Sequence, residues 1–186
     1  MTKTRKIAVI VGSLRKASLN RMAAHALAKL APEGFELEIV EIGDLPLYDE
    51  DVEAAGAPGA WERLRAQVKA SDAVLFVTPE YNRSVPGALK NAIDVGSRPY
   101  GASVFARKPA AVMSLSPGAM GGFGANHHLR QSLVFLDMPV LQQPEAYVGG
   151  AGALFDDQGN IVADGTRAFF KTFIDAFAAW IDRHAA

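Results

Sequence analysis

Short apolar runs alternate with segments of helical periodicity along the whole chain. The apolar runs, at 7–11, 37–42, 73–77, 110–115 and more weakly 139–148, have the length of buried strands. The segments between and after them repeat apolar residues every three to four positions and predict helices at 18–31, 58–70, 86–97, 121–135 and 164–184. This alternation predicts a parallel sheet with right-handed crossovers and helices on both faces.

The number and order of these elements define the expected fold class. Five strands separated by helices predict an α/β, doubly wound parallel sheet of the flavodoxin-like order 2-1-3-4-5. A length of 186 residues suits one domain, and we expect residues 1–186 to form it.

Two segments need a separate interpretation. The aromatic and aliphatic residues of 164–184 recur at helical spacing, which favours a core-facing stripe over a cofactor site. The stretch 43–59 is irregular, acidic and rich in Pro, Ala and Gly, and we expect a solvated surface loop rather than a lid over a substrate.

Composition narrows the classes of partner. The chain has 19 basic and 20 acidic side chains, a balance that gives no electrostatic field for nucleic acid or anionic lipid. It has no cysteine, so any redox chemistry must come from a bound cofactor. The first apolar run is too short for a signal peptide or a membrane span, and we expect a cytoplasmic protein.

The loop after the first strand has the groups that a phosphate monoester needs. It carries Ser13, Ser18 and Asn20 as side-chain donors and Arg15 as a cation, and the following helix adds backbone amides and its dipole. It contains neither a dinucleotide nor a P-loop glycine pattern, which favours a mononucleotide. The alternative is that Ser18 only caps the helix while Arg15 and Asn20 face water.

Two further loops leave neighbouring strands at the same edge. The loop 78–86 is bounded by prolines and carries Tyr81, Asn82 and Ser84, which suit the edge of a flavin ring; a well-formed turn with no ligand explains it equally well. The loop 114–122 is rich in glycine, so its backbone can come close to a ligand. A planar ring on a phosphate handle fits all three loops, and FMN fits best.

Other chemistries find little support. The histidines are isolated or adjacent along a helix, which argues against a metal site, and no Gly-x-Ser-x-Gly nucleophile motif occurs. The segment 156–160 begins like a calcium loop but lacks its spacing, and we expect a turn.

These loops resemble the NAD(P)H-dependent FMN reductase family, a flavodoxin-like group that includes chromate and quinone reductases and azoreductases. The resemblance extends over nearly the whole chain. It depends on the motifs Gly12-Ser13-Leu14-Arg15 with Ser18 and Asn20, Pro79-Glu80-Tyr81-Asn82 with Ser84, Pro86, Leu89-Lys90-Asn91 and Asp94, and Ser116-Pro117-Gly118 before Gly121-Gly122. Val95 departs from the pattern, because many relatives have tryptophan after the aspartate.

The resemblance implies a function and a set of cofactor-binding residues. It implies an enzyme that takes a hydride from NADPH or NADH onto FMN and reduces quinones, azo or nitro compounds, metal oxyanions or free flavin in a ping-pong cycle, with no catalytic side chain required. The phosphate would be held by Ser13, Arg15, Ser18 and Asn20, with Leu19 also binding the cofactor, and the ring would be bordered by Pro79, Glu80, Tyr81, Asn82, Ser84, Ser116 and Gly118.

We also expect the protein to form a homodimer or homotetramer. Family members are dimers or tetramers, and the helix 86–97 has apolar residues on two sides, so we expect it to meet a second copy.

Two competing functions stay open. A flavodoxin-type electron carrier is one competing function, although such carriers are strongly acidic. A Rossmann-type NAD(P) domain with Glu41 on the ribose is the other, although the glycine fingerprint is missing.

Overall fold

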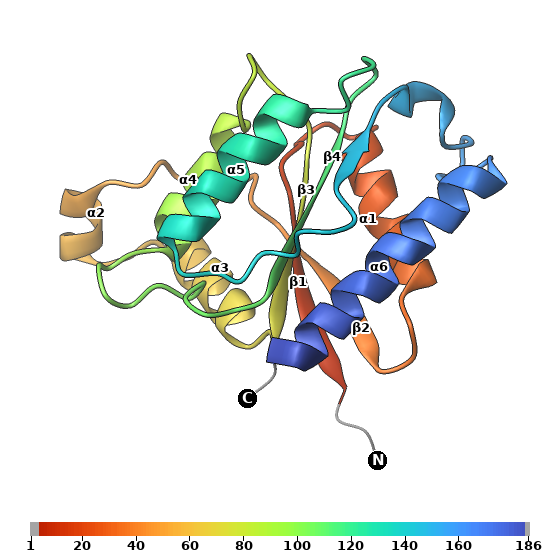
Figure 1. The fold of residues 1–186 in the computed structure, drawn as a ribbon. Coiled ribbons are helices and arrows are strands. Elements are labelled where there is room, and N and C mark those ends of the chain that lie inside the picture. Colours follow the sequence, from red (N-terminus) through yellow and green to blue (C-terminus); the bar gives the residue numbers. More distant parts are fainter. Residues whose placement is uncertain (1–3, 185–186) are drawn as a thin grey trace.

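The computed structural model describes residues 4–184 and contains the predicted five-stranded parallel sheet. The strand order is β2-β1-β3-β4-β5, so the flavodoxin-like order 2-1-3-4-5 is confirmed (Figure 1). The strands are β1 (Arg5–Val11), β2 (Phe35–Val40), β3 (Ala73–Thr78), β4 (Ala110–Leu115) and β5 (Ala146–Val148). In the register Val9 lies opposite Ile39 on one side and Leu75 on the other, which places β1 between β2 and β3.

The helices cover the two faces of the sheet unequally. Figure 1 shows α1 (Leu19–Leu30) and α6 (Asp164–His184) together on one face, and α3 (Gly59–Lys69), α4 (Gly87–Gly96) and α5 (Phe123–Phe135) on the other. A short helix α2 (Glu50–Ala55) lies outside these layers, and a 3-10 turn spans Ala151–Ala153.

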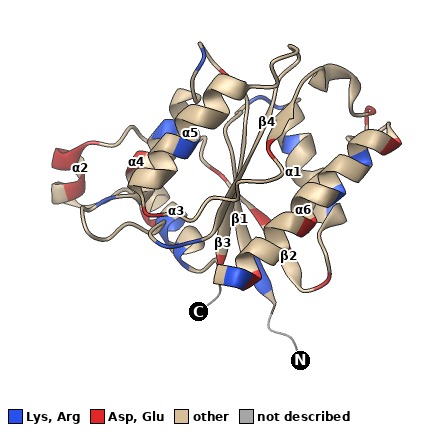
Figure 2. Cartoon of the chain, in the orientation of Figure 1, with Lys and Arg blue, Asp and Glu red and all other residues tan. Residues whose placement is uncertain are grey.

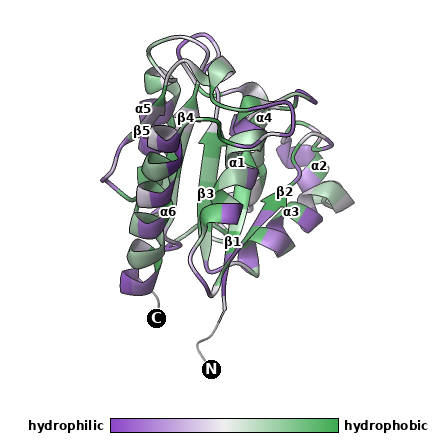
Figure 3. Cartoon of the chain, turned by 90° about the vertical axis from the view of Figure 1, so that its right-hand side faces the viewer, coloured by the Kyte–Doolittle hydropathy of each residue, from purple (hydrophilic) through white to green (hydrophobic). Residues whose placement is uncertain are grey.

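A separate apolar core fills each face. Alternate strand residues such as Ile7 and Val9 pack with α1 and α6, while Ala8 and Ile10 pack with α3, α4 and α5. In Figure 3 the strands form an apolar layer, and the helices carry their hydrophilic residues on the outside. Phe170, Phe173 and Phe177 of α6 are buried, which confirms that its aromatic stripe belongs to the core.

Two predicted elements differ from the observed ones. The last strand is only Ala146–Val148: residues 139–141 pair with Ala110 of β4 as an isolated bridge, and Pro144, which has no backbone N–H, lies in the break before Ala146. The stretch 43–59 contains helix α2, where a loop was expected. Asp49 caps this helix by accepting the N–H of Asp51, and acidic residues in the first turn suit the helix dipole (Figure 2).

The apolar residues on two sides of helix 86–97 give no argument for a contact with a second copy, and that contact stays a prediction. Leu89, Ala92, Ile93 and Val95 of α4 are all buried within one chain, because α3 and the sheet cover both of its apolar sides. The exposed apolar residues nearby are Val134 and Phe135, at the end of α5.

The carboxyl ends of the strands lie at one edge of the molecule, opposite the start of β1 and the end of α6 (Figure 1). The loops that follow β1, β3 and β4 therefore meet there, as the strand order requires. Of the expected domain 1–186, residues 1–3 and 185–186 lie outside the described residues. Within 4–184, no helix combines the length and the apolar character needed to cross a membrane.

Candidate functional site

The three predicted loops meet around one cavity of about 120 Å³ at the carboxyl edge of the sheet. Nine of the twelve predicted cofactor-binding residues line it, although their positions in the chain are up to about a hundred residues apart. The lining residues are Ser13, Arg15, Ser18, Leu19, Asn20, Pro79, Glu80, Tyr81, Leu115, Ser116 and Pro117.

The loop after β1 supplies the polar wall of the cavity. Ser13, Ser18 and Asn20 are buried, whereas Arg15 is exposed at the rim. Within residues 4–184 the Arg15 guanidinium has no ion-pair partner, so it is available to an anion. Buried hydroxyls and an amide beside a free cation make this wall suitable for a phosphate group.

Ser18 caps helix α1 and faces the cavity at the same time. Its Oγ accepts the N–H of Arg21 at 3.2 Å, and the residue has the extended backbone of a helix cap. A hydroxyl that accepts one hydrogen bond can still donate another. Capping and ligand binding, which the sequence presented as alternatives, are therefore compatible.

Asn20 is the clearest sign that this wall is built for a ligand. The residue is 5% exposed, and its side-chain oxygen has no hydrogen-bond partner in the described part of the chain. A buried polar atom without a partner is costly and uncommon. A half-turn about the terminal bond of the carboxamide exchanges its oxygen and its NH₂, so Asn20 can offer either an acceptor or donors to a molecule in the cavity.

The first two loops come close because residue 12 is glycine. A Cβ atom on Gly12 would lie 2.8 Å from Oγ1 of Thr78 and 3.3 Å from the ring of Pro79. Thr78 ends β3 and Pro79 begins the second loop. A larger residue at position 12 would therefore push the phosphate wall and the second loop apart.

The second loop is only partly directed at the cavity. Pro79, Glu80 and Tyr81 line it, and Tyr81 is 47% exposed at the rim. Asn82 lies in the exposed turn of the loop, and the Ser84 hydroxyl bonds to His128 of α5 at 2.9 Å. Neither residue lines the cavity, and their contact with the ring stays a prediction.

The third loop contributes another part of the cavity wall. Ser116 lines the cavity as predicted, together with Leu115 and Pro117, which the sequence analysis did not select. Little in the sequence indicated that these two residues bind a ligand, because apolar residues at strand ends and prolines in turns are common throughout proteins. Gly118 lies just behind this wall and donates its N–H to Oγ of Ser116 at 3.2 Å.

An ion pair lies beside the phosphate wall. Arg21 donates two hydrogen bonds to Glu41, at 2.8 and 2.7 Å, and the guanidinium lowers the pKa of the Glu41 carboxyl below its ordinary value. The pairing keeps Glu41 ionised, but it also occupies both carboxylate oxygens. Glu41 is therefore poorly placed to bind a ribose, as the Rossmann alternative required, and the strand order also differs from that fold.

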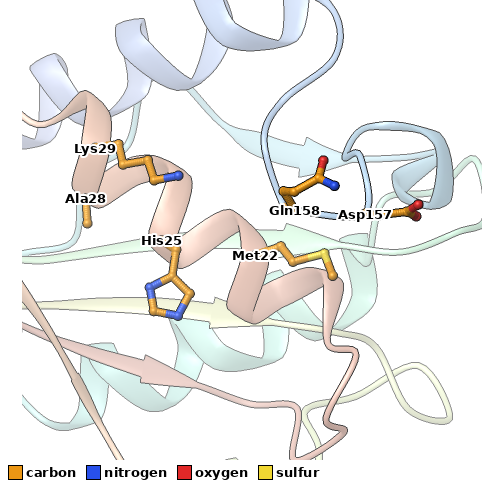
Figure 4. Close-up of a pocket in the computed structure, with 7 residues that line it drawn as sticks. Met22, His25, Ala28, Lys29, Asp157 and Gln158 are labelled. Carbon is orange, nitrogen blue, oxygen red and sulfur yellow. The ribbon is translucent and has the colours of Figure 1, made fainter.

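A larger hollow of about 540 Å³ lies on the outside of α1, against the turn at 157–159. In Figure 4 its side chains point in different directions: His25 and Lys29 diverge along α1, and the Asp157 carboxylate points away from both. Its polar groups do not converge on one point, so it offers no comparable binding geometry.

The remaining sequence motifs make contacts within the protein. Asp156 accepts the N–H groups of Gln158 and Asn160, so the predicted turn at 156–160 is confirmed. His127 and His128 contact different partners, the hydroxyls of Tyr147 and Ser84 respectively. Within 4–184 no group of three or more His, Asp and Glu side chains is placed to hold a metal ion.

Comparison with known proteins gives one consistent result. The family model described as NADPH-dependent FMN reductase matches residues 5–153. A quinone reductase of Pseudomonas putida is 63% identical over all of both chains, and a 2-hydroxy-1,4-benzoquinone reductase of a Burkholderia species is 47% identical over 95% of this chain and 96% of its own. The solved structure of FerB, a flavoenzyme NAD(P)H:(acceptor) oxidoreductase from Paracoccus denitrificans, covers 97% of this chain and 98% of its own at 43% identity, with a TM-score of 0.91.

Proposed function

The chain belongs to the NADPH-dependent FMN reductase family, and we propose that it passes electrons from NADPH or NADH to a quinone by way of FMN held at the carboxyl edge of the sheet. The expected class of enzyme, a flavin-dependent oxidoreductase, is confirmed by this membership. The competing carrier function loses its basis, because the full-length relatives are named as reductases. The quinone acceptor and the binding residues are the proposal.

The observation that carries the proposal is the meeting of three loops around one cavity with an unpartnered buried amide. The residues present fit a phosphate monoester: Ser13 and Ser18 offer hydroxyls, and Asn20 offers an amide and Arg15 a cation that find no partner among the residues that the structure describes. The amino terminus of α1 adds its partial positive charge on the same side.

The ring would extend from this wall between the second and third loops. Tyr81 at the rim suits contact with an aromatic ring, and the backbone groups near Pro79 and Ser116 suit its polar edge. When bound, FMN supplies the atom that accepts hydride and the two-electron transfer. The chain's own residues anchor the cofactor and leave one side open, so nicotinamide and acceptor would use that side in turn, in a ping-pong cycle.

Two further expectations remain predictions. A homodimer or homotetramer is supported by the exposed Val134 and Phe135, which lie beside the buried α4 rather than on it. A cytoplasmic location is the second of these predictions, and a chain without cysteine, which needs no disulfide, is compatible with it.

The test is a visible absorption spectrum of the purified protein after incubation with FMN and gel filtration, followed by NADPH without oxygen. We expect flavin bands that co-elute with the protein, bleach on addition of NADPH, and return on addition of a benzoquinone. A colourless protein, or bands that NADPH leaves unchanged, would refute the proposed function. Bleached bands that a quinone fails to restore would refute the proposed acceptor alone.

A further inference from the structure

The loop after β3 forms a tight hairpin in a demanding backbone conformation. Tyr81 and Ser84 exchange two backbone hydrogen bonds, N–H of Tyr81 to Ser84 O at 3.0 Å and N–H of Ser84 to Tyr81 O at 2.9 Å. The two residues between them, Asn82 and Arg83, have φ angles of 50° and 63°. This left-handed conformation is unfavourable for arginine, so the surroundings must hold the hairpin in place.

The Glu80 side chain, which is only 11% exposed, makes the first contact that holds the hairpin in place. Its Oε2 accepts the N–H of Ala125 at 3.1 Å, and its Oε1 accepts a hydrogen bond from Arg83 at 3.0 Å. Ala125 lies in the first turn of α5, whose own N-cap residue Gly122 has no side chain to offer. Glu80 therefore caps α5 from a different loop, and its negative charge suits that end of the helix.

The close contact between the hairpin and α5 requires a glycine, Gly124, in the first turn of the helix. A Cβ atom on Gly124 would lie 2.8 Å from the carbonyl oxygen of Arg83 and 2.9 Å from Oε2 of Glu80. One helical turn further, Nδ1 of His128 lies 2.9 Å from Oγ of Ser84. The hairpin is thus fastened to the same helix at both of its ends.

These contacts join two walls of the cavity. Pro79, Glu80 and Tyr81 belong to the second loop, and the third loop, which contributes Ser116, leads through Gly122 directly into α5. Fastening the hairpin to α5 therefore fixes the spacing between the second and third loops.

We propose that Glu80 and His128 are positioning residues that hold the ring-binding hairpin against α5 and so set the width of the cofactor cleft. This rests on the proposed function, since the cleft is taken to hold the flavin. The Glu80 carboxylate acts through the Ala125 amide and His128 acts through Ser84; neither has to touch the cofactor.

Amide hydrogen exchange of the flavin-free protein measures directly how firmly Glu80 and His128 hold the hairpin against α5. In Glu80→Ala we expect exchange of the Tyr81 and Ser84 amides to rise about tenfold or more, while the amides of 73–77 in β3 stay as protected as in the wild type. Glu80→Gln retains an acceptor oxygen and should restore most of the protection. His128→Ala should give a smaller rise, and the matched control His127→Ala, whose ring contacts Tyr147 instead, should give none.

FMN titration of the same proteins measures the consequence. Glu80→Ala should weaken binding about five- to thirtyfold and shift the visible bands of the bound flavin, with Glu80→Gln close to the wild type. Unchanged exchange at Tyr81 and Ser84 in Glu80→Ala would overturn the attachment. Faster exchange with unchanged affinity and spectrum would overturn the positioning role.

The two measurements separate this proposal from the proposed function. If the wild-type protein does not bind FMN, the function fails and the positioning role fails with it, but the exchange measurement still decides whether Glu80 and His128 hold the hairpin. If Glu80→Ala does not fold, His128→Ala against His127→Ala decides the same question.

Discussion

At the scale of single residues, the site depends on side chains that serve structure and binding together. Ser18 caps α1 and keeps its hydroxyl proton for a ligand, while Glu80 lines the cavity and caps α5. Arg15 differs from both, because it is exposed, unpaired within the described residues and held by no packing. Replacing the Arg15 side chain should therefore change ligand affinity while leaving the stability of the fold almost unchanged.

For this reason Arg15→Ala should weaken FMN binding without a change in thermal stability of the flavin-free protein. Loss of a charged hydrogen bond to phosphate costs about 1.5–3 kcal/mol, or about ten- to a hundredfold in the dissociation constant. Fluorescence titration of FMN checks this, with Lys16→Ala as the matched control, since Lys16 is the adjacent exposed cation and does not line the cavity. Equal affinities for the two variants would contradict the assignment of Arg15.

At the scale of elements, α4 shows how a sequence pattern can be misinterpreted. Its apolar residues on two sides suggested a subunit contact, yet both sides are buried within the chain. The last turn of α4 is packed so closely that Gly96 allows Phe105 to lie directly against the helix backbone. A helix between a sheet and another helix needs two apolar sides for the monomer alone.

Gly96→Ala should therefore destabilise the protein despite the better helix propensity of alanine. The new Cβ would lie 2.5 Å from a ring carbon of the fully buried Phe105, and such overpacking costs about 1–3 kcal/mol. Denaturant unfolding of the flavin-free protein measures the loss. Gly87→Ala on the same helix is the control, because a Cβ atom at Gly87 would meet no other atom within 4 Å. The stability of this control should equal or slightly exceed that of the wild type, and an equal loss in both variants would contradict the packing explanation.

At the scale of the whole molecule, the acidic helix α2 is tied to the layer of α3 and α4 by one partly buried ion pair. Arg65 of α3 donates to both carboxylate oxygens of Glu53, at 2.9 and 2.5 Å, and to the backbone oxygen of Val95 in α4 at 3.0 Å. The pairing lowers the pKa of Glu53 in the folded protein. One guanidinium thus links three helices, and its contact with α2 is to a carboxylate whose charge is lost when the pH falls far enough.

The pH dependence follows from the direction of that shift. A carboxyl with a lowered folded-state pKa stabilises the fold above its unfolded pKa, about 4.3, and loses the contribution as the pH falls through the folded value. Glu53→Gln should cost about 1 kcal/mol at pH 7 and progressively less as the pH falls below the unfolded pKa of about 4.3. Urea unfolding at a series of pH values from 7 downward checks it, with the exposed Glu50→Gln of the same helix as control; a cost for Glu53→Gln that does not decrease as the pH falls would contradict the ion-pair explanation.

The sequence by itself determined the order of strands and helices, the buried stripe of α6 and the loops that form the site. These depend on local apolar periodicity and on the rule that parallel strands bring their carboxyl ends to one edge, and both can be read along the chain. Nine of the twelve expected cofactor-binding residues line the cavity for that reason.

Only the tertiary structure decided how the loops are held and which polar groups are left free. Three features depend on residues that are far apart in the chain: the Asn20 side-chain oxygen that no described residue satisfies, the cap that Glu80 gives to α5, and the bond between Ser84 and His128. Local pattern carries no information on such contacts, because a carboxylate in a loop looks the same whether it faces water or the end of a distant helix. The burial of both sides of α4 could not be predicted for the same reason, because it depends on contacts with distant segments.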